Sequence, residues 1–298
     1  MDSPELSVVI PSVNGLSDLL GCLEAVEQLR ASIRLDVLVV DRLGGDLPSA
    51  VRRRFPEVRV LSTGQDATIP QMRDLAFREV RGAAVAVIED HIIVPPTWGK
   101  QLLSALAEGH DVVGGPIENA ATKGLVDPAS FLCEYSACLP PLPTGDADWL
   151  PGNNIVYRRA LLDRYLAVTA EGGWENRLHD AIKRDGGRLW CQGDLIVGHK
   201  MHYTFAGYLS QRFLYARSYA GARVAHAPPA RRLAYGGAAF LLPPLLLYRT
   251  LQRLASKRVP LGLVAKSLPL IGVFVCSWGL GEVAGYWFGA GDSLRKVR

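Results

Sequence analysis

Residues 83–91 read AAVAVIEDH, a short apolar run that ends directly in two carboxylates and an imidazole. An uninterrupted apolar run of this length predicts a strand that is buried on both faces of a sheet. Oxygen ligands at the end of such a strand are suited to a divalent cation, and Glu89 and His91 point to the same side if the chain stays extended. The alternative for this stretch alone is an acidic pair that caps a strand-to-helix turn.

The sequence on either side of this stretch alternates between apolar runs and apolar residues at helical spacing. This alternation predicts an α/β fold, in which a mostly parallel sheet is covered by helices on both faces. From about Lys123 to Asp148 the pattern weakens and three prolines cluster, which predicts an irregular loop. Strands are expected at 6–10, 36–41, 58–61, 83–88 and 111–114, and helices near 17–29, 70–80, 97–106, 175–184 and 204–223.

Polar residues directly follow three of the expected strands. They are the turn from Pro11 to Asn14, Asp41, and the acidic stretch at 89–91. Ligands bind parallel sheets beyond the carboxyl ends of the strands. We therefore expect these residues to share one binding site.

In the order and spacing of these motifs, the chain resembles the inverting glycosyltransferases of family 2, which have the GT-A fold. The resemblance runs from about Leu6 to Gly221. It implies a Rossmann-like catalytic domain at 1–225, with a nucleotide-sugar half at about 1–115 and an acceptor half at about 116–225. It also implies sugar transfer from a nucleotide sugar, with a UDP-sugar favoured, with inversion and with the help of Mg²⁺ or Mn²⁺.

The resemblance assigns roles on the donor side of the site. It implies that Asp41 holds the base of the nucleotide and that Arg73 approaches the diphosphate. The acidic motif of the family is usually Asp-x-Asp, so the Glu-Asp-His sequence at 89–91 is a departure from it. The residues expected to bind the nucleotide sugar are Pro11, Asn14, Asp41, Arg73 and Asp90, and those expected to bind the metal are Glu89, His91 and His202.

Two further segments resemble the acceptor side of the family. Gly152, Asn153 and Asn154 are expected to line the acceptor site. The segment GWEN at 173–176 matches the place of an acidic pair, but its second acid is replaced by Asn, which leaves Glu175 as the expected catalytic base. Trp174 is expected to form an apolar wall beside it. The alternative for Glu175 is a first-turn carboxylate that is favoured by the helix dipole.

Residues 226–298 differ in composition from the rest of the chain and are expected to form membrane-associated helices. Apolar segments at 233–248 and 261–290 are separated and flanked by basic residues. A crossing of the membrane and a re-entrant or interfacial arrangement both remain open, and the latter keeps every basic group on the cytoplasmic face. The alternative is a set of buried helices, or an oligomer interface between copies of the chain.

The composition narrows the class of protein. A net charge of +4 without a long Lys/Arg tract argues against a nucleic-acid partner. Five scattered cysteines predict neither a zinc site nor a disulfide framework, which favours a catalytic domain that faces the cytoplasm. The sequence therefore predicts a membrane-associated glycosyltransferase that acts on a lipid-linked or saccharide acceptor.

Two other classes of protein are alternatives to this prediction. The first is a catalytically silent GT-A-like module that recruits partners at the membrane, which the altered acidic motif and Asn176 make plausible. The second is a nucleotidyltransferase. It ranks last because a glycine-rich phosphate loop with a basic residue is expected after its first strand, and Gly15 alone does not provide one.

Overall fold

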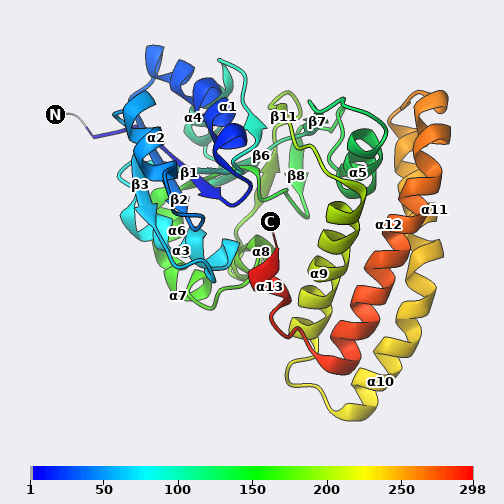
Figure 1. Cartoon of the computed structure of the whole chain (residues 1–298). Helices are drawn as coiled ribbons and strands as arrows, with labels where there is room; N and C mark the ends of the chain where they lie inside the picture. The colour runs from blue at the N-terminus through cyan, green and yellow to red at the C-terminus, as the bar shows by residue number, and fades with distance from the viewer. Residues whose placement is uncertain (1–2, 298) are drawn as a thin grey trace. The chain divides into compact units, whose positions relative to one another are not determined.

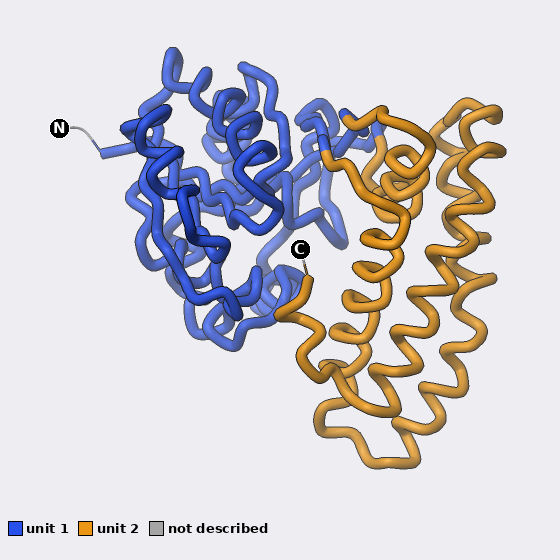
Figure 2. The backbone as a smooth tube through the Cα atoms, in the orientation of Figure 1, with its two compact units in different colours: residues 1–120, 140–200 blue, residues 121–139, 201–298 orange. Residues whose placement is uncertain are grey.

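The computed structural model describes residues 3–297, and these form two compact units (Figure 2). Unit 1 comprises the chain up to Ala120 together with Pro140–Lys200, and unit 2 comprises Ala121–Leu139 and Met201 onward. Two helices before residue 225 group with the C-terminal helices in unit 2. The domain division expected from the sequence, 1–225 and 226–298, stays a prediction.

Unit 1 is built on a central sheet with the order β3-β2-β1-β4-β9-β6-β10-β8 (Figure 1). The first four strands of this order run parallel, whereas β9 runs antiparallel to both β4 and β6. The strands are β1 (Leu6–Ser12), β2 (Leu35–Asp41), β3 (Arg59–Ser62), β4 (Ala84–Ile88), β6 (Val112–Gly114), β8 (Gly145–Ala147), β9 (Asn154–Arg158) and β10 (Leu189–Cys191).

The register of these strands positions the site. Ser12 is paired with Asp41, so the carboxyl ends of β1 and β2 meet at the same edge of the sheet. Because β9 is antiparallel to β4, its first residue, Asn154, lies opposite Ile88, the last residue of β4. The segment before β9 is therefore brought beside the acidic stretch that follows β4.

A small second sheet adds a further segment to this edge. Its order is β5-β11-β7, formed by Ile92–Ile93, Val197–His199 and Ile117–Asn119. His199 is paired with Ile92 in this sheet. It consequently lies next to the chain segment that carries His91, 108 residues earlier in the sequence.

Helices flank the central sheet, as the sequence pattern predicted (Figure 1). Helix α3 begins with a capping box in which Thr68 and Gln71 bond reciprocally. Helix α1 begins at Leu16, one residue before the start expected near 17. The helices of unit 1 are α1 (Leu16–Glu27), α2 (Leu47–Arg54), α3 (Ile69–Glu79), α4 (Trp98–Ala107), α6 (Arg159–Arg164), α7 (Leu166–Thr169) and α8 (Glu175–Arg184), with a 3₁₀ turn at Gln28–Ala31.

Unit 2 is helical. The prediction of an irregular loop at 123–148 was wrong for its first part, because helix α5 occupies Val126–Tyr135. Pro128 is tolerated there because it lies in the first turn, and Phe131 and Leu132 anchor the helix by burial. The other helices are α9 (Phe205–Arg223), α10 (Pro229–Ala238), a 3₁₀ turn (Ala239–Leu241), α11 (Leu242–Ser256), α12 (Leu261–Phe288) and α13 (Ser293–Lys296).

Helix α12 organises unit 2. Within residues 3–297 it is the one helix long and apolar enough to cross a membrane, judged by length and composition. It packs against α9, and α11 lies along its other side (Figure 1). Its one carboxylate, Glu282, is buried and accepts a hydrogen bond from Trp278 Nε1 at 2.9 Å, while Arg223 of α9 lies 3.5 Å away. Pairing of this kind lowers the cost of placing a charge in an apolar helix.

Small residues allow α9 and α12 to approach closely. A Cβ atom added at Gly285 would lie 2.6 Å from the carbonyl oxygen of Arg217 and 2.7 Å from the Cβ of Ala220. By contrast, a Cβ atom at Gly272 of the same helix would meet nothing within 4 Å. The position of α12 on α9 thus depends on the missing side chain at 285.

We predict opposite effects of the same substitution at these two glycines. Gly285→Ala should lower the free energy of unfolding by about 1–3 kcal/mol, because backbone atoms of α9 must move. Gly272→Ala should leave it unchanged or raise it by about 0.5–1 kcal/mol, through helix propensity. Thermal unfolding of the two purified variants in detergent, followed by circular dichroism, measures the difference. Equal melting temperatures for the two variants would contradict this account of the helix interface.

Candidate active site

The buried carboxylate of Asp90 connects the ends of β1 and β4. Its Oδ2 accepts hydrogen bonds from the backbone amides of Val13 and Asn14, at 2.7 and 2.9 Å, and its Oδ1 accepts one from Asn14 Nδ2 at 2.8 Å. Burial raises the pKa of Asp90, but the hydrogen bonds from His91 and Asn14 outweigh it and hold the pKa below its usual value. Asp90 is therefore ionised, and it fixes the turn at Pro11–Asn14. Its expected contact with a nucleotide sugar stays a prediction.

Glu89, His91 and His199 form a group that could hold a metal ion. One ligand atom from each lies within 4.8 Å of the others. The Nε2 atoms of His91 and His199 are 3.0 Å apart, and Glu89 Oε2 is 3.4 Å from His91 Nε2. A carboxylate oxygen and two imidazole nitrogens are a ligand set that divalent transition metals accept.

The protonation of the two imidazoles bears on metal binding. His91 Nδ1 lies 3.1 Å from Asp90 Oδ1; burial lowers the pKa of His91, but this hydrogen bond and the charges of Glu89 and Asp90 outweigh burial and raise the pKa, so a cation at Nε2 would displace a proton. Burial, and next the neighbouring His91, hold the pKa of His199 well below its usual value. His199 is consequently neutral, which is the form that binds metal. Glu89 and His91, which the sequence predicted to bind a metal, thus belong to one group that could hold an ion, and metal binding by them stays a prediction.

The segment before β9 supports the group from one side. Asn153 Nδ2 donates to Glu89 Oε2 at 2.9 Å. Asn154 has a different environment, since its Oδ1 accepts from Trp98 Nε1 at 3.0 Å and its Nδ2 donates to the carbonyl oxygens of Pro116 and Leu195. Asn153 thus faces the acid, while Asn154 is fully engaged in bracing the strands around it.

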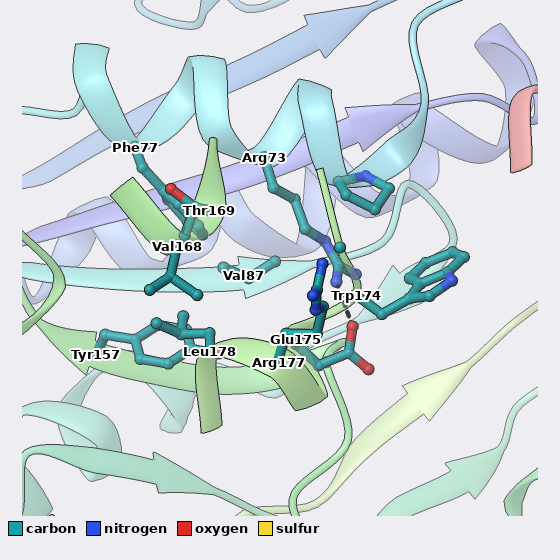
Figure 3. A pocket seen from close by; sticks show the side chains of 13 residues that line it. Arg73, Phe77, Val87, Tyr157, Val168, Thr169, Trp174, Glu175, Arg177 and Leu178 are labelled. Atoms are coloured by element: carbon teal, nitrogen blue, oxygen red, sulfur yellow. Dashed lines mark hydrogen bonds and ion pairs between the residues drawn. The ribbon is translucent and has the colours of Figure 1, made fainter. Parts of the chain in front are cut away.

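A second pair of charges lies beside the first group. Arg73 Nη1 of α3 donates to Glu175 Oε2 of α8 at 2.8 Å, and Figure 3 shows this ion pair at the edge of a largely apolar pocket. Gly152 permits the approach of Glu175, because a Cβ at position 152 would lie 2.8 Å from both carboxylate oxygens. The pocket is also lined by Phe77, Val87, Tyr157, Val168, Trp174 and Leu178.

Charges of the metal-binding group and of the Arg73–Glu175 pair influence each other. Burial lowers the pKa of Arg73, but the charge of Glu175, followed by that of Glu89, outweighs it and raises the pKa. The adjacent residues Gly152 and Asn153 contact Glu175 and Glu89, respectively. Glu89 and Glu175 therefore contact neighbouring residues of one segment, and their shared role in one site stays a prediction.

One buried contact at the wall of the pocket was not predicted from the sequence. The hydroxyl of Tyr157 lies 2.9 Å from His179 Nε2, and both side chains are buried. Burial lowers the pKa of His179 to about 4, so its ring is neutral and adds no charge beside Glu175. Their helical and strand positions look like ordinary core positions, which is why no sequence signal marks them.

Asp41 is the last residue of β2, which lies beside β1 in the central sheet. Its carboxylate is buried and accepts hydrogen bonds from the amides of Leu43 and Gly44, at 2.9 and 3.1 Å. These bonds shape the turn after β2. Binding of a nucleotide base by Asp41, like that of the diphosphate by Arg73, stays a prediction.

His202 is placed differently from the other expected metal ligands. It belongs to unit 2, where its Nδ1 lies 2.8 Å from Asp127 Oδ2. The described metal-binding group contains His199 in its place. Ligation by His202 stays a prediction. The signal in favour of His199 is that it ends the apolar run at 195–198, as His91 follows the run at 83–88.

The comparisons with known proteins identify the class. The family model described as Glycosyl transferase family 2 matches residues 7–164, more than half of the chain. The chain therefore belongs to glycosyltransferase family 2, and it is a glycosyltransferase with the GT-A fold. The fold class and enzyme class expected from the sequence are confirmed.

Solved structures agree with this fold. The chain is similar to the mannosyltransferase PcManGT from Pyrobaculum calidifontis in complex with GDP-Man and Mn²⁺, with 18% identity, a TM-score of 0.54, and coverage of 95% of this chain and 88% of that one. It is also similar to S. aureus TarS 1–349, with 13% identity, a TM-score of 0.51, and coverage of 94% and 90%. No curated protein matches the sequence.

We predict that His199 and His202 differ in their effect on metal binding. His199→Gln should weaken the binding of Mn²⁺ by about tenfold or more, because it removes an imidazole nitrogen of the group. His202→Gln, the matched control, should change it by less than about twofold. Titration of each variant with Mn²⁺ alone, with the free ion followed by electron paramagnetic resonance, measures both. A larger loss in His202→Gln would instead support the ligand expected from the sequence.

Proposed function

We propose that this glycosyltransferase moves a sugar from a nucleotide sugar to an acceptor hydroxyl in a single in-line displacement, with inversion at the anomeric carbon. One observation carries the proposal. Gly152 and Asn153 bring Glu175, a candidate base, beside Glu89, a candidate metal ligand. In this arrangement, the base and the group that stabilises the leaving group would act on opposite sides of one reacting carbon.

Glu175 is suited to removing the acceptor proton. Its Oε2 is held by Arg73, whereas its Oε1 has no hydrogen-bond partner in the described part of the chain. Arg73 thereby orients the carboxylate and leaves one oxygen for the acceptor hydroxyl. Trp174 and the apolar residues of the pocket exclude water from this side.

On the donor side, Glu89, His91 and His199 would hold a divalent cation. Such a cation supplies positive charge that stabilises a departing nucleoside diphosphate. The complex of PcManGT with GDP-Man and Mn²⁺ supports a nucleotide-sugar donor and favours Mn²⁺ over Mg²⁺. The nucleotide is proposed as UDP from the family resemblance, with GDP as the alternative from PcManGT.

The acceptor is proposed to be a lipid-linked saccharide or polyprenyl phosphate at the cytoplasmic face of a membrane. Helix α12 has the length and composition to cross it. Among the described residues, the exposed large hydrophobic side chains of unit 1 are Leu43 and Trp149, whereas those of unit 2 are far more numerous. Exposed apolar surface of this extent marks a membrane or an interface between copies of the chain.

We predict that Glu175→Gln lowers the rate of sugar transfer by about 10²–10⁴-fold, because the amide cannot accept the acceptor proton. Binding of the nucleotide sugar should persist. Glu171→Gln, an exposed carboxylate four residues earlier, is the matched control and should keep the rate of the unmodified enzyme. Single-turnover transfer from a radiolabelled UDP- or GDP-sugar measures both variants. Full transfer by Glu175→Gln would eliminate the assignment of the base.

A further inference from the structure

Unit 2 contains a cavity of about 600 Å³ that the proposed reaction does not use. It lies among α5, α9, α10, α11 and α12, and its volume is in the range of cavities that hold small-molecule ligands. Its lining combines charged and apolar side chains. The charged ones are Glu134, Arg212, Arg223, Arg249, Arg253 and Glu282.

Two of the arginines are compensated by the two glutamates. Arg212 Nη1 lies 3.6 Å from Glu134 Oε1, and Arg223 Nη1 lies 3.5 Å from Glu282 Oε2. The guanidinium of Arg212 also stacks on the indole of Trp278, with 4.1 Å from Cζ to the ring centroid. These four charges therefore cancel in pairs and hold the inner wall of the cavity in place.

Arg249 and Arg253 are not compensated. They lie one turn apart on α11, and their guanidinium groups have no hydrogen bond or ion pair with any of residues 3–297. Four arginines against two glutamates leave a surplus of two positive charges on the lining. Two guanidinium groups at this spacing can contact one phosphate or diphosphate from the same side.

The rest of the lining is mainly apolar, with hydroxyl groups from Tyr235, Thr250 and Tyr286. Leu242, Leu246 and Val275 contribute to the cavity wall. Leu241 and Leu245, from the same part of the chain, are exposed to the outside. An anionic group bound by Arg249 and Arg253 would thus have apolar surface beside it, which a soluble anion does not need.

We propose that this cavity binds the phosphate group of a lipid, with Arg249 and Arg253 holding the phosphate and the wall around Leu242 and Leu246 holding the start of the hydrocarbon chain. The inference rests on the proposed membrane attachment and on a lipid-linked acceptor. It gives unit 2 a ligand-binding role of its own, separate from the donor site of unit 1.

The test measures binding of farnesyl phosphate to the full-length protein in detergent, by isothermal titration calorimetry and without any nucleotide sugar. The double variant Arg249→Gln/Arg253→Gln should bind about tenfold or more weakly. Lys266→Gln removes one positive charge from an exposed position of α12 outside the cavity. It is the matched control and should change the affinity by less than about twofold.

Farnesol and inorganic pyrophosphate distinguish the two parts of the ligand. Both should bind far more weakly than farnesyl phosphate. If farnesol bound as tightly as farnesyl phosphate, the cavity would bind only the hydrocarbon chain. If pyrophosphate bound as tightly, the cavity would be a site for free anions. If the double variant kept its affinity for farnesyl phosphate, Arg249 and Arg253 would not hold the phosphate. Each result overturns the proposal. These measurements contain no nucleotide sugar and so do not test the donor site. If the proposed donor site were wrong, the protein would not bind a nucleotide sugar.

Discussion

The site depends on one buried charge, the carboxylate of Asp90. It is excluded from water and satisfied by two backbone amides and by the side chains of Asn14 and His91. Since an unpaired carboxylate at this depth is very costly, the turn after β1 and the imidazole after β4 are held where they can reach it. The same contact directs the other nitrogen of His91 toward Glu89 and His199. One interaction therefore joins the sheet to the proposed metal site.

The reversal of direction at β9 provides the second half of the site. An all-parallel sheet would carry the segment 151–153 to the opposite edge. Because β9 runs antiparallel to β4, this segment enters at the edge where Glu89 lies, with Gly152 against Glu175 and Asn153 against Glu89. The absence of a side chain at 152 is what allows the carboxylate of Glu175 to lie against the segment that contacts Glu89.

Apolar runs in the sequence were sufficient to predict much of the fold, because strands that are buried on both faces consist almost entirely of apolar residues. The runs at 6–10, 36–41 and 83–88 became β1, β2 and β4, and Glu89, which follows β4, lies in a group that could hold a metal ion. Contacts between distant segments could not be predicted. The pairing of Arg73 with Glu175 spans 102 residues, and the choice of His199 over His202 depends on the pairing of β11 with β5. Helix α5 was missed because Pro128 within it, the three prolines after it and its short apolar run are typical of a loop.

The central claim is that the cation group and the Arg73–Glu175 pair serve one nucleotide-sugar site. The most direct measurement is the melting temperature of the protein with a panel of UDP-, GDP- and TDP-sugars, each with and without Mn²⁺. A ligand that binds the folded form raises this temperature by mass action. The account predicts that at least one nucleotide sugar raises it more with Mn²⁺ than the sum of the two separate effects, and that Glu89→Gln abolishes the excess. A panel in which no nucleotide sugar changes the melting temperature, or in which Mn²⁺ makes no difference, would contradict it.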